Sequence, residues 1–323
     1  MARFKSTLYL KSAIIFEITL LDDMFVAREF PERETIQKLR NQIPCRKDDL
    51  IEWPDVLVHS KVKRYFKVVP ESSFTILSVN GLGKAHITFK KKSLNICKDT
   101  FFIVKPFESF EYSIDEETAV EVLNFHLGIG SYQEVLSGIT ENDEMLLSDP
   151  GTTFKDCVFT NHLHFKPQIF SHILNCYDCE DRHAYILNVV GYTLKLMNAG
   201  IPFLNRIQRA KSSTKKELYR RMSLARDIIY SQYDDPFLTL DYLSRETSMS
   251  KYHFLRVFKQ TFGNTPHKMI QQIRIRKISE LLLHGTMPIS EIALKTGIQE
   301  PNSIYTLLKK HGYPEGDGIS NFE

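Results

Sequence analysis

The chain has 323 residues, more than one compact core usually holds, so its length favours two domains. Apolar residues make up 42% of the chain and charged residues 25%, which excludes a collagen, a coiled-coil rod and a disordered acidic tail. From residue 211 onward there are 17 Lys and Arg against 12 Asp and Glu, and before it 25 against 27. This moderately basic last third permits a nucleic-acid partner without requiring one, because a solvated surface has the same composition.

The cysteines and the apolar runs both point to a cytoplasmic protein. Five scattered cysteines suggest no disulfide framework, which fits a reducing compartment. Glu17 interrupts the apolar segment SAIIFEITLL, residues 12–21, and no cleavage pattern of small residues follows it, which argues against a signal peptide. No uninterrupted apolar run reaches the about 18 residues that a membrane span needs. We therefore predict cytoplasmic localisation and no membrane partner.

Residues 56–127 have the pattern of a small antiparallel β structure. β-Branched and aromatic residues alternate with polar ones, and turn residues such as Asn80-Gly81 separate the runs. Several short strands at this spacing favour a barrel or a sandwich. Barrel alternation alone gives the following candidates for the lining of a small-molecule pocket: Phe89, Phe110, Tyr112 and His126.

Helical periodicity replaces the alternation between residues 166 and 197. Apolar residues such as Phe170 and Leu174 recur at a spacing of three to four, so two amphipathic helices are predicted. Gly200 and Pro202 end this stretch. We expect these helices to pair two protomers in a homodimer.

One set of potential metal ligands shares a helix face in this region, namely His172, Cys176, Cys179 and His183. As one continuous helix the set would span roughly 16 Å, whereas zinc ligands lie about 2.0–2.3 Å from the ion. Alternatively, the run from Asp178 to Asp181 interrupts the helix and folds it back. A CxxC without a second pair is a weak metal signal, and small buried residues at a helix interface account for it.

A second histidine pair, His162-Leu163-His164, is predicted to lie outside the barrel. Two histidines at alternate positions of a strand can share a metal, but loop or strand-edge histidines are the favoured explanation of the pair. We find no HExxH, GxSxG, phosphate-binding loop or dinucleotide fingerprint. The sequence therefore predicts no metal, no cofactor and no enzymatic activity.

The character of the chain changes again near residue 206. Residues 206–214 are polar and basic and are predicted to link a domain covering 1–205 to one covering 215–323. From residue 215 to 310 every segment has the pattern of a short helix, and no strand pattern occurs. The second domain is therefore predicted to be all-α, which gives the chain as a whole an α+β architecture.

A pair of short helices is predicted at about residues 238–262. Thr239 is placed to cap the first helix, whose Leu240, Leu243 and Ser244 face inward. Ser250 is placed to cap the second helix with its side-chain oxygen. Two short helices joined by a tight turn form a helix-turn-helix.

The second helix of this pair has one apolar and one mixed side. At about 100° per residue the apolar side holds Phe254, Val257, Phe258 and Thr261. The other side holds Tyr252, Leu255, Arg256 and Lys259. Long donors on a rigid helix can read the major groove of DNA, where arginine pairs with guanine and apolar groups contact thymine methyls.

The same pattern recurs about fifty residues later, as in a diluted internal repeat. A linking helix starts at Thr265 as cap and Pro266 as first helical residue, and it ends at Gly285. A second helix pair is then predicted at about 288–311, with its turn at Gly297. Its inward residues are Ile289, Ile292, Ala293, Ile304, Leu307 and Leu308. Its outward residues are Asn302, Tyr305, Thr306 and Lys309.

Residues 218–314 resemble the DNA-binding domain of AraC/XylS-type bacterial transcription regulators. The matching text is LTLDYLSRETSMSKYHFLRVFKQTFGNTPHKMIQQIRIRKISELL, followed by ISEIALKTGI. The resemblance implies a sequence-specific regulator whose two recognition helices enter successive major grooves, about 34 Å apart. By this carry-over, and by adding nearby cations as phosphate contacts, the predicted DNA-binding residues are Ser250, Lys251, Tyr252, Leu255, Arg256, Lys259, Asn302, Thr306, Lys309 and Lys310.

The resemblance also has implications for the first domain and for partners. It implies a cupin-like barrel followed by two helices, which senses a small-molecule effector, dimerises, or both. It further implies promoter DNA and RNA polymerase as partners. Two other classes stay open: a cupin-type enzyme fused to a helical domain, and a protein-interaction module that does not read DNA.

The second helix pair departs from the family pattern. Ile298 and Leu308 stand where the family usually has phenylalanine, and Thr306 replaces a frequent arginine. The closing segment is contracted to Gly312-Tyr313-Pro314. These departures leave two alternatives: a loosely packed second unit, or one that binds mostly through phosphate contacts from Lys309 and Lys310.

Overall fold

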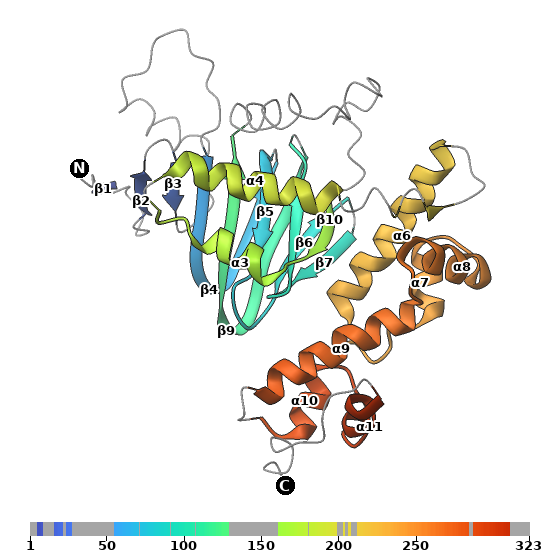
Figure 1. Ribbon diagram of the computed structural model, residues 1–323. Helices are drawn as coiled ribbons and strands as arrows, with labels where there is room; N and C mark the ends of the chain where they lie inside the picture. The colour runs from blue at the N-terminus through green and yellow to red at the C-terminus, as the bar shows by residue number, and fades with distance from the viewer. Residues whose placement is uncertain are drawn as a thin grey trace. The chain divides into compact units, whose positions relative to one another are not determined.

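The computed structural model separates the chain into two compact units, Met1–Gly200 and Ile201–Glu323 (Figure 1). Among the residues that the structure describes, the first unit contains a sheet and two helices and the second contains helices alone, which confirms the α+β class. The residues that the structure describes are 5–8, 16–21, 24–27, 55–70, 72–90, 92–106, 108–128, 161–179, 181–198, 203, 206–207, 212–283 and 287–310.

One hydrogen-bonded sheet forms the body of the first unit. Its strands are β1 (Lys5–Leu8), β2 (Phe16–Leu21), β3 (Met24–Ala27), β4 (Asp55–Val69), β5 (Phe74–Ser78), β6 (Ala85–Phe89), β7 (Lys92–Ile96), β8 (Thr100–Val104), β9 (Phe110–Leu127) and β10 (His162–Phe165). The strand order is β1-β2-β3-β4-β9-β5-β8-β10, with β6 pairing β7 and β9. This path does not close among the described strands, so the cupin-like barrel stays a prediction.

β4 and β9 are the two long strands at the centre of the sheet. Their antiparallel register runs from Val56 opposite His126 to Val69 opposite Phe110, with an irregularity between Val62 and Arg64. The first half of β9 alternates buried and more exposed residues, as a strand with one covered face requires. β5 and β6 pair with different halves of β9, so this one strand joins two parts of the sheet.

Two helices, α3 (Gln168–Asn175) and α4 (Arg182–Asn198), lie across one face of the sheet (Figure 1). Aromatic side chains make the contact: the rings of Phe170 and Phe101 are 4.8 Å apart, and those of Tyr185 and Phe125 are 6.0 Å apart. The two predicted helices are therefore confirmed. The fold-back alternative is also correct, because α3 ends at Asn175, before the run from Asp178 to Asp181, and α4 begins after it at Arg182.

The strand β10 carries His162 and His164 and pairs with β8, so the expectation that they lie outside the β structure was wrong. The strand-edge alternative is correct, because β10 ends the strand order. His164 is paired opposite Phe101 of β8, and the two rings stack with centroids 5.3 Å apart. Both histidines are only 9% exposed. The sequence pattern missed this strand because four residues give too short an alternation to recognise, and they lie far from the other predicted strands.

The second unit consists of short helices. They are α6 (Ser212–Gln232), α7 (Leu240–Glu246), α8 (Lys251–Phe262), α9 (Pro266–Leu283), α10 (Ile289–Lys295) and α11 (Ser303–Lys310). α6 begins inside residues 206–214, which the sequence assigned to a linker. Serine and threonine are common both in linkers and at helix starts, so composition alone misplaced this boundary.

Two separate apolar cores hold these helices together. The first joins α6, α7, α8 and α9 through Met222, Ala225, Ile228, Ile229, Leu238, Leu243, Phe254, Val257, Phe258 and Ile270. The second joins α9, α10 and α11 through Ile275, Ile278, Ile292, Ala293, Ile304 and Leu308. Helix α9 contributes to both cores and thereby links the two helix pairs. None of the described helices is long and apolar enough to cross a bilayer.

Candidate nucleic-acid interface

The first helix pair is α7 and α8. The Thr239 hydroxyl accepts a hydrogen bond from the Tyr242 backbone N–H at 3.2 Å, which confirms the predicted cap of α7. Ser248, at a left-handed φ of 53°, reverses the chain after α7, and the Met249 N–H closes the turn on the Ser244 carbonyl at 2.9 Å. Gly263 ends α8 at a φ of 76°, the left-handed conformation that glycine adopts without strain.

The Ser250 side chain makes no capping hydrogen bond, so that part of the sequence prediction was wrong. Ser250 does occupy the N-cap position, and its backbone carbonyl accepts the first helical bond from Phe254 at 2.8 Å. The backbone conformation, extended at a ψ of 145°, is that of an N-cap. The sequence therefore identified the N-cap residue of α8 correctly, but it did not predict that the Ser250 hydroxyl makes no capping hydrogen bond.

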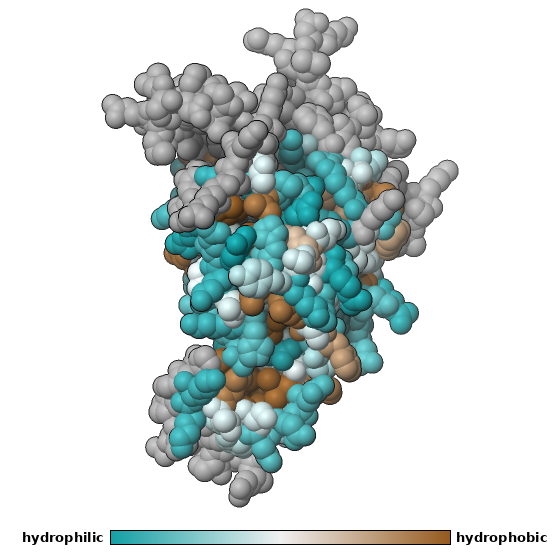
Figure 2. Space-filling view, turned by 90° about the vertical axis from the view of Figure 1, so that its right-hand side faces the viewer, coloured by the Kyte–Doolittle hydropathy of each residue, from teal (hydrophilic) through white to brown (hydrophobic). Residues whose placement is uncertain are grey.

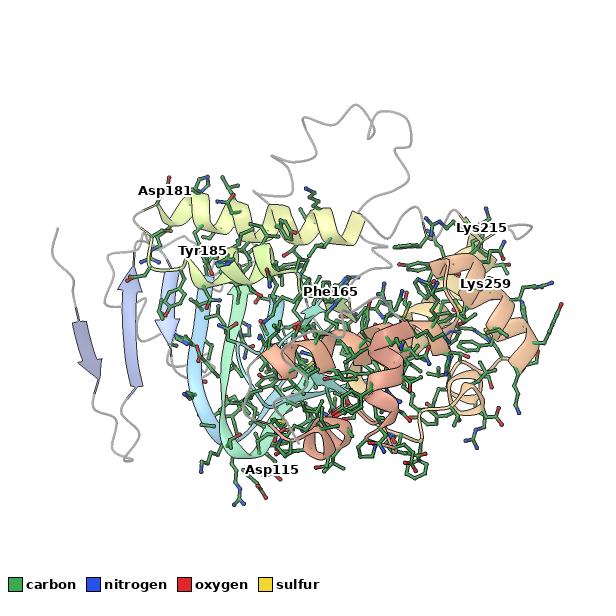
Figure 3. All side chains as sticks on the ribbon, turned by 60° about the horizontal axis from the view of Figure 1, so that its bottom comes forward. Asp115, Phe165, Asp181, Tyr185, Lys215 and Lys259 are labelled. Carbon is green, nitrogen blue, oxygen red and sulfur yellow. The ribbon has the colours of Figure 1, made fainter. Side chains whose placement is uncertain are left out.

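Helix α8 divides into the two sides that its periodicity predicts. Its buried residues are Phe254, Val257, Phe258 and Thr261. Tyr252 is 77% exposed, Arg256 and Lys259 are exposed, and Leu255 is half-buried. Figure 3 labels Lys259 on this helix. An exposed tyrosine ring between cations is costly to hydrate and is available for contact with an outside partner.

One predicted phosphate contact has an internal partner. The Lys251 ammonium lies 2.6 Å from a carboxylate oxygen of Asp241 on α7, and both side chains are exposed. An exposed ion pair of this kind is worth little, so a phosphate can compete for the lysine. Lys251 can therefore contact a phosphate only if its ion pair with Asp241 breaks.

The second helix pair is α10 and α11. Ile304 and Leu308 of α11 are buried against α9 and α10, and Ile298 and Leu307 pack at the edge of the same core. Leucine and isoleucine thus fill the positions where the family has phenylalanine, and Leu308 is only 3% exposed. The side turned outward carries Asn302, Tyr305, Thr306, Lys309 and Lys310, all of them exposed.

Arg221 of α6 supports the first helix-turn-helix in a way that the sequence did not indicate. Its guanidinium donates to the carbonyls of Thr247 and Ser248 in the turn, at 3.4 and 3.1 Å, and to the Glu217 carboxylate at 2.8 Å. Glu217 is held ionised by Arg220 and Arg221, which lower its pKa. The contact joins residues 26 apart, so no local pattern could reveal it.

The linking helix α9 separates the two recognition helices. It has 18 residues, which corresponds to about 27 Å at 1.5 Å per residue. Thr265 caps it through the Lys268 N–H at 3.3 Å, and Pro266 is its first residue, as predicted. Gly285 and the contracted segment 312–314 lie outside the described residues.

The residues proposed for a small-molecule pocket lie in the first unit, mostly within its packed interior. Phe89, Phe110 and Tyr112 are 7%, 3% and 1% exposed, and burial raises the pKa of Tyr112. His126 is half-buried as a residue, but Nδ1 lies 3.0 Å from the Thr75 hydroxyl and Nε2 is enclosed, so burial lowers its pKa to about 3. These side chains contribute to packing, and their role in ligand binding stays a prediction.

Two of the potential metal ligands, Cys176 and Cys179, lie at the surface between α3 and α4. Cys176 is exposed and Cys179 is intermediate, so the expectation of small buried residues at a helix interface was wrong. Among the residues that the structure describes, no three His, Cys, Asp or Glu side chains are grouped so as to hold a metal ion.

Figure 2 shows a largely hydrophilic face with small, separate apolar patches.

Comparisons with known proteins agree with this geometry. Residues 243–312 match the family described as "Helix-turn-helix domain". An uncharacterized HTH-type transcriptional regulator of Bacillus subtilis is 41% identical over 63 residues, 20% of this chain and 22% of that protein. The bifunctional transcriptional activator and DNA repair enzyme Ada of Escherichia coli is 30% identical over 129 residues, 39% of this chain and 35% of that protein.

A solved structure covers a similar stretch. The C-terminal domain of the response regulator yesN from Fusobacterium nucleatum is 31% identical and aligns with 28% of this chain and 94% of that one, at a TM-score of 0.27. The matches to the curated relatives span about a fifth to a third of their length. The second unit is thus a double helix-turn-helix domain. Its match to the helix-turn-helix family and to transcription regulators confirms the resemblance to AraC-type DNA-binding domains seen in the sequence.

Proposed function

We propose that the chain is a transcription regulator that binds specific sequences in double-stranded promoter DNA. The observation that carries this proposal is the exposed side of α8, on which Tyr252, Arg256 and Lys259 stand opposite a fully buried apolar side. A second helix with an exposed polar side, α11, follows after one long linking helix. This arrangement supports two recognition helices that dock in successive major grooves.

The individual residues have distinct proposed roles. Arg256 donates to a base edge, and Tyr252 and Leu255 provide apolar or base contacts. Lys251, Lys259, Lys309 and Lys310 contact phosphates, and Ser250 lies at the N-terminus of α8, where backbone N–H groups attract an anion. Asn302 and Thr306 face the second groove.

The rest of the chain supports a sensing and assembly role. The effector is a small molecule bound by the sheet of the first unit, near Phe89, Phe110, Tyr112 and His126. Helices α3 and α4 pair two copies of the chain, and RNA polymerase is the downstream partner. A cytoplasmic location follows from the DNA partner. The family match favours this reading over a cupin-type enzyme or a protein-interaction module.

Fluorescence anisotropy on labelled genomic fragments tests the proposal. The full chain should bind some fragments far more tightly than others, and log K should fall linearly with log salt, by about 0.9 per phosphate contact. Arg256→Ala should reduce the preference among fragments. Binding that is equally weak for all fragments and unaffected by Arg256→Ala would contradict the proposal.

A further inference from the structure

Arg274 lies in the middle of α9 and joins the two helix pairs. Its guanidinium donates from Nε to the Tyr233 carbonyl at 2.7 Å and from a terminal nitrogen to the Asp235 carbonyl at 2.9 Å. Both carbonyls belong to the loop that follows α6. Helix α6 shares the first apolar core with α7 and α8, the first helix pair. A planar guanidinium that donates to two main-chain carbonyl oxygens fixes this loop against α9 in one orientation.

Gly297, in the turn between α10 and α11, approaches the same loop from the other side. A Cβ atom on Gly297 would overlap the Asp234 carbonyl oxygen and lie 2.7 Å from the Asp234 carbonyl carbon and 3.0 Å from the Arg274 guanidinium. Gly297 also has a φ of 69°. Backbone thus packs directly on backbone, with no side chain between them to absorb a shift.

The two apolar cores meet α9 on either side of Arg274. The first contains residues of α6 to α9 up to Ile270, and the second contains residues of α9 from Ile275 onward. Arg274 lies between these two positions. The loop at 233–235, Arg274 and Gly297 therefore form a junction that holds the second helix pair at a set angle and distance from the first.

We propose that Arg274 and Gly297 are positioning residues that fix the interval between the two DNA half-sites read by α8 and α11. This inference rests on the proposed function. Neither residue lies on the exposed side of a recognition helix, so both act through the placement of other side chains. Rigid placement makes one interval favourable and penalises duplexes whose half-sites are a base pair closer or further apart.

Selection from random duplexes tests the proposal without a known operator. The full chain is used to enrich binders from a library with a random core of about 30 base pairs, which holds two half-sites one turn apart. The wild type should enrich two motifs at one fixed interval. Arg274→Lys, which keeps the charge but loses the fork, should enrich the same motifs over a spread of intervals and bind the fixed-interval duplex about tenfold more weakly.

Controls separate positioning from folding and from the proposed function. Arg276→Lys, at an exposed arginine of the same helix, should retain the fixed interval, and Gly297→Ala provides a second variant that acts from the opposite side of the junction. Thermal unfolding identifies any variant that fails to fold. An unchanged interval in both junction variants overturns the inference. If the wild type enriches no motif at all, the proposed function fails, and the inference falls with it.

An independent observation concerns the turn between α3 and α4. Cys176-Tyr177-Asp178-Cys179 is closed by a hydrogen bond from the Cys179 N–H to the Cys176 carbonyl at 3.3 Å. In such a turn the end Cα atoms lie within about 7 Å, which overlaps the range of about 4.4–6.8 Å seen in disulfides. Neither cysteine is buried.

The turn is held in place on both sides. The Tyr177 hydroxyl lies 2.9 Å from Nδ1 of His59, whose Nε2 lies 3.0 Å from the Glu121 carboxylate on β9. On the other side, the Asp181 carboxylate caps α4 by accepting from the Ala184 N–H at 2.9 Å. The turn that carries both cysteines is therefore held in place at its two ends, and the Cys179 thiol donates to the Asp181 carbonyl at 3.2 Å.

We infer that Cys176 and Cys179 form a dithiol that is oxidised by small disulfides such as glutathione disulfide. The thiolate of the more exposed Cys176 attacks the disulfide and releases one glutathione thiolate. Cys179 then attacks the mixed disulfide and releases the second, so that one disulfide is reduced as another forms and the two thiol protons pass to the leaving thiolates.

Mass spectrometry after alkylation tests this second inference on the full chain. Treatment with glutathione disulfide should protect Cys176 and Cys179 together as one internal bond, and dithiothreitol should restore both. Cys176→Ser should leave Cys179 without that bond, whereas Cys97→Ser should have no effect on it. Separate glutathione adducts on both cysteines, or two thiols that stay free, would overturn it.

Discussion

At the residue scale, Arg256 and Lys259 are close neighbours on the exposed side of α8, yet their expected contributions differ. Arginine can donate two hydrogen bonds to guanine, whereas a lysine directed at phosphate carries no sequence information. Arg256→Ala should cost about 1–3 kcal/mol of discrimination at one base pair. Lys259→Ala should weaken binding to all duplexes alike and reduce the salt slope by about 1. Anisotropy titrations on single-base-pair variants of a selected duplex measure both; equal effects of the two substitutions would contradict the assignment.

A buried lysine in the first unit gives a pH prediction. Lys166 is 4% exposed, its ammonium donates to the Ser78 hydroxyl at 2.8 Å and to the Val79 carbonyl at 2.5 Å, and burial lowers its pKa to about 8. The unfolded chain, with the ordinary lysine pKa of about 10.4, binds more protons between these two values, so stability should rise with pH across this window. Urea unfolding should show this rise in the wild type, and a smaller rise in Lys166→Met. An identical pH dependence in both proteins would show that Lys166 is not the titrating group.

At the element scale, the two helix caps of the first pair provide a matched comparison. The Thr239 hydroxyl caps α7, whereas the Ser250 hydroxyl makes no capping bond to α8. Thr239→Ala should therefore lower the unfolding free energy of the second unit by about 1 kcal/mol. Ser250→Ala should stay within about 0.5 kcal/mol of the wild type. Denaturant unfolding of the full chain compares the two; an equal loss in both variants would contradict the geometry at Ser250.

The helices of the second unit were predictable because their signals are local. Periodicity identified both sides of α8, and Thr239, Thr265 and Pro266 marked helix starts. The family resemblance added the prediction that two helix-turn-helix units are joined by one long helix. Contacts between residues far apart in the chain, such as Arg221 with the turn and Arg274 with the loop after α6, leave no local pattern and could not be predicted.

The first unit was predictable only in outline. Alternation identified residues 56–127 as strands, because several short runs follow one another there with turn residues between them. The strands β1, β2, β3 and β10 were missed because each is short and lies apart from that stretch. The direction of a side chain is set by the register with neighbouring strands, which the sequence does not fix. For this reason the histidines of β10 were misplaced. The burial of Cys176 and Cys179 was wrongly predicted because they lie in the turn between α3 and α4 and not on a helix face.

At the scale of the whole molecule, the pairing of two copies through α3 and α4 is open to a direct test. Leu187 of α4 is 40% exposed and Ile169 of α3 is 55% exposed, so both offer apolar surface to a partner. Leu187→Glu should place a charge in the proposed interface and shift the chain from dimer to monomer in light scattering. Asn188→Glu, at the neighbouring exposed position, should have a smaller effect. A wild type that is monomeric at all concentrations would contradict the proposed dimer.

The central claim is that α8 enters the major groove and that Arg256 reads a guanine there. Methylation interference on a duplex selected by the wild type tests this claim most directly, because methylation of guanine N7 blocks that contact alone. One guanine should interfere with binding of the wild type but not with binding of Arg256→Ala. The same interference pattern for both proteins would place Arg256 outside the groove and contradict the account.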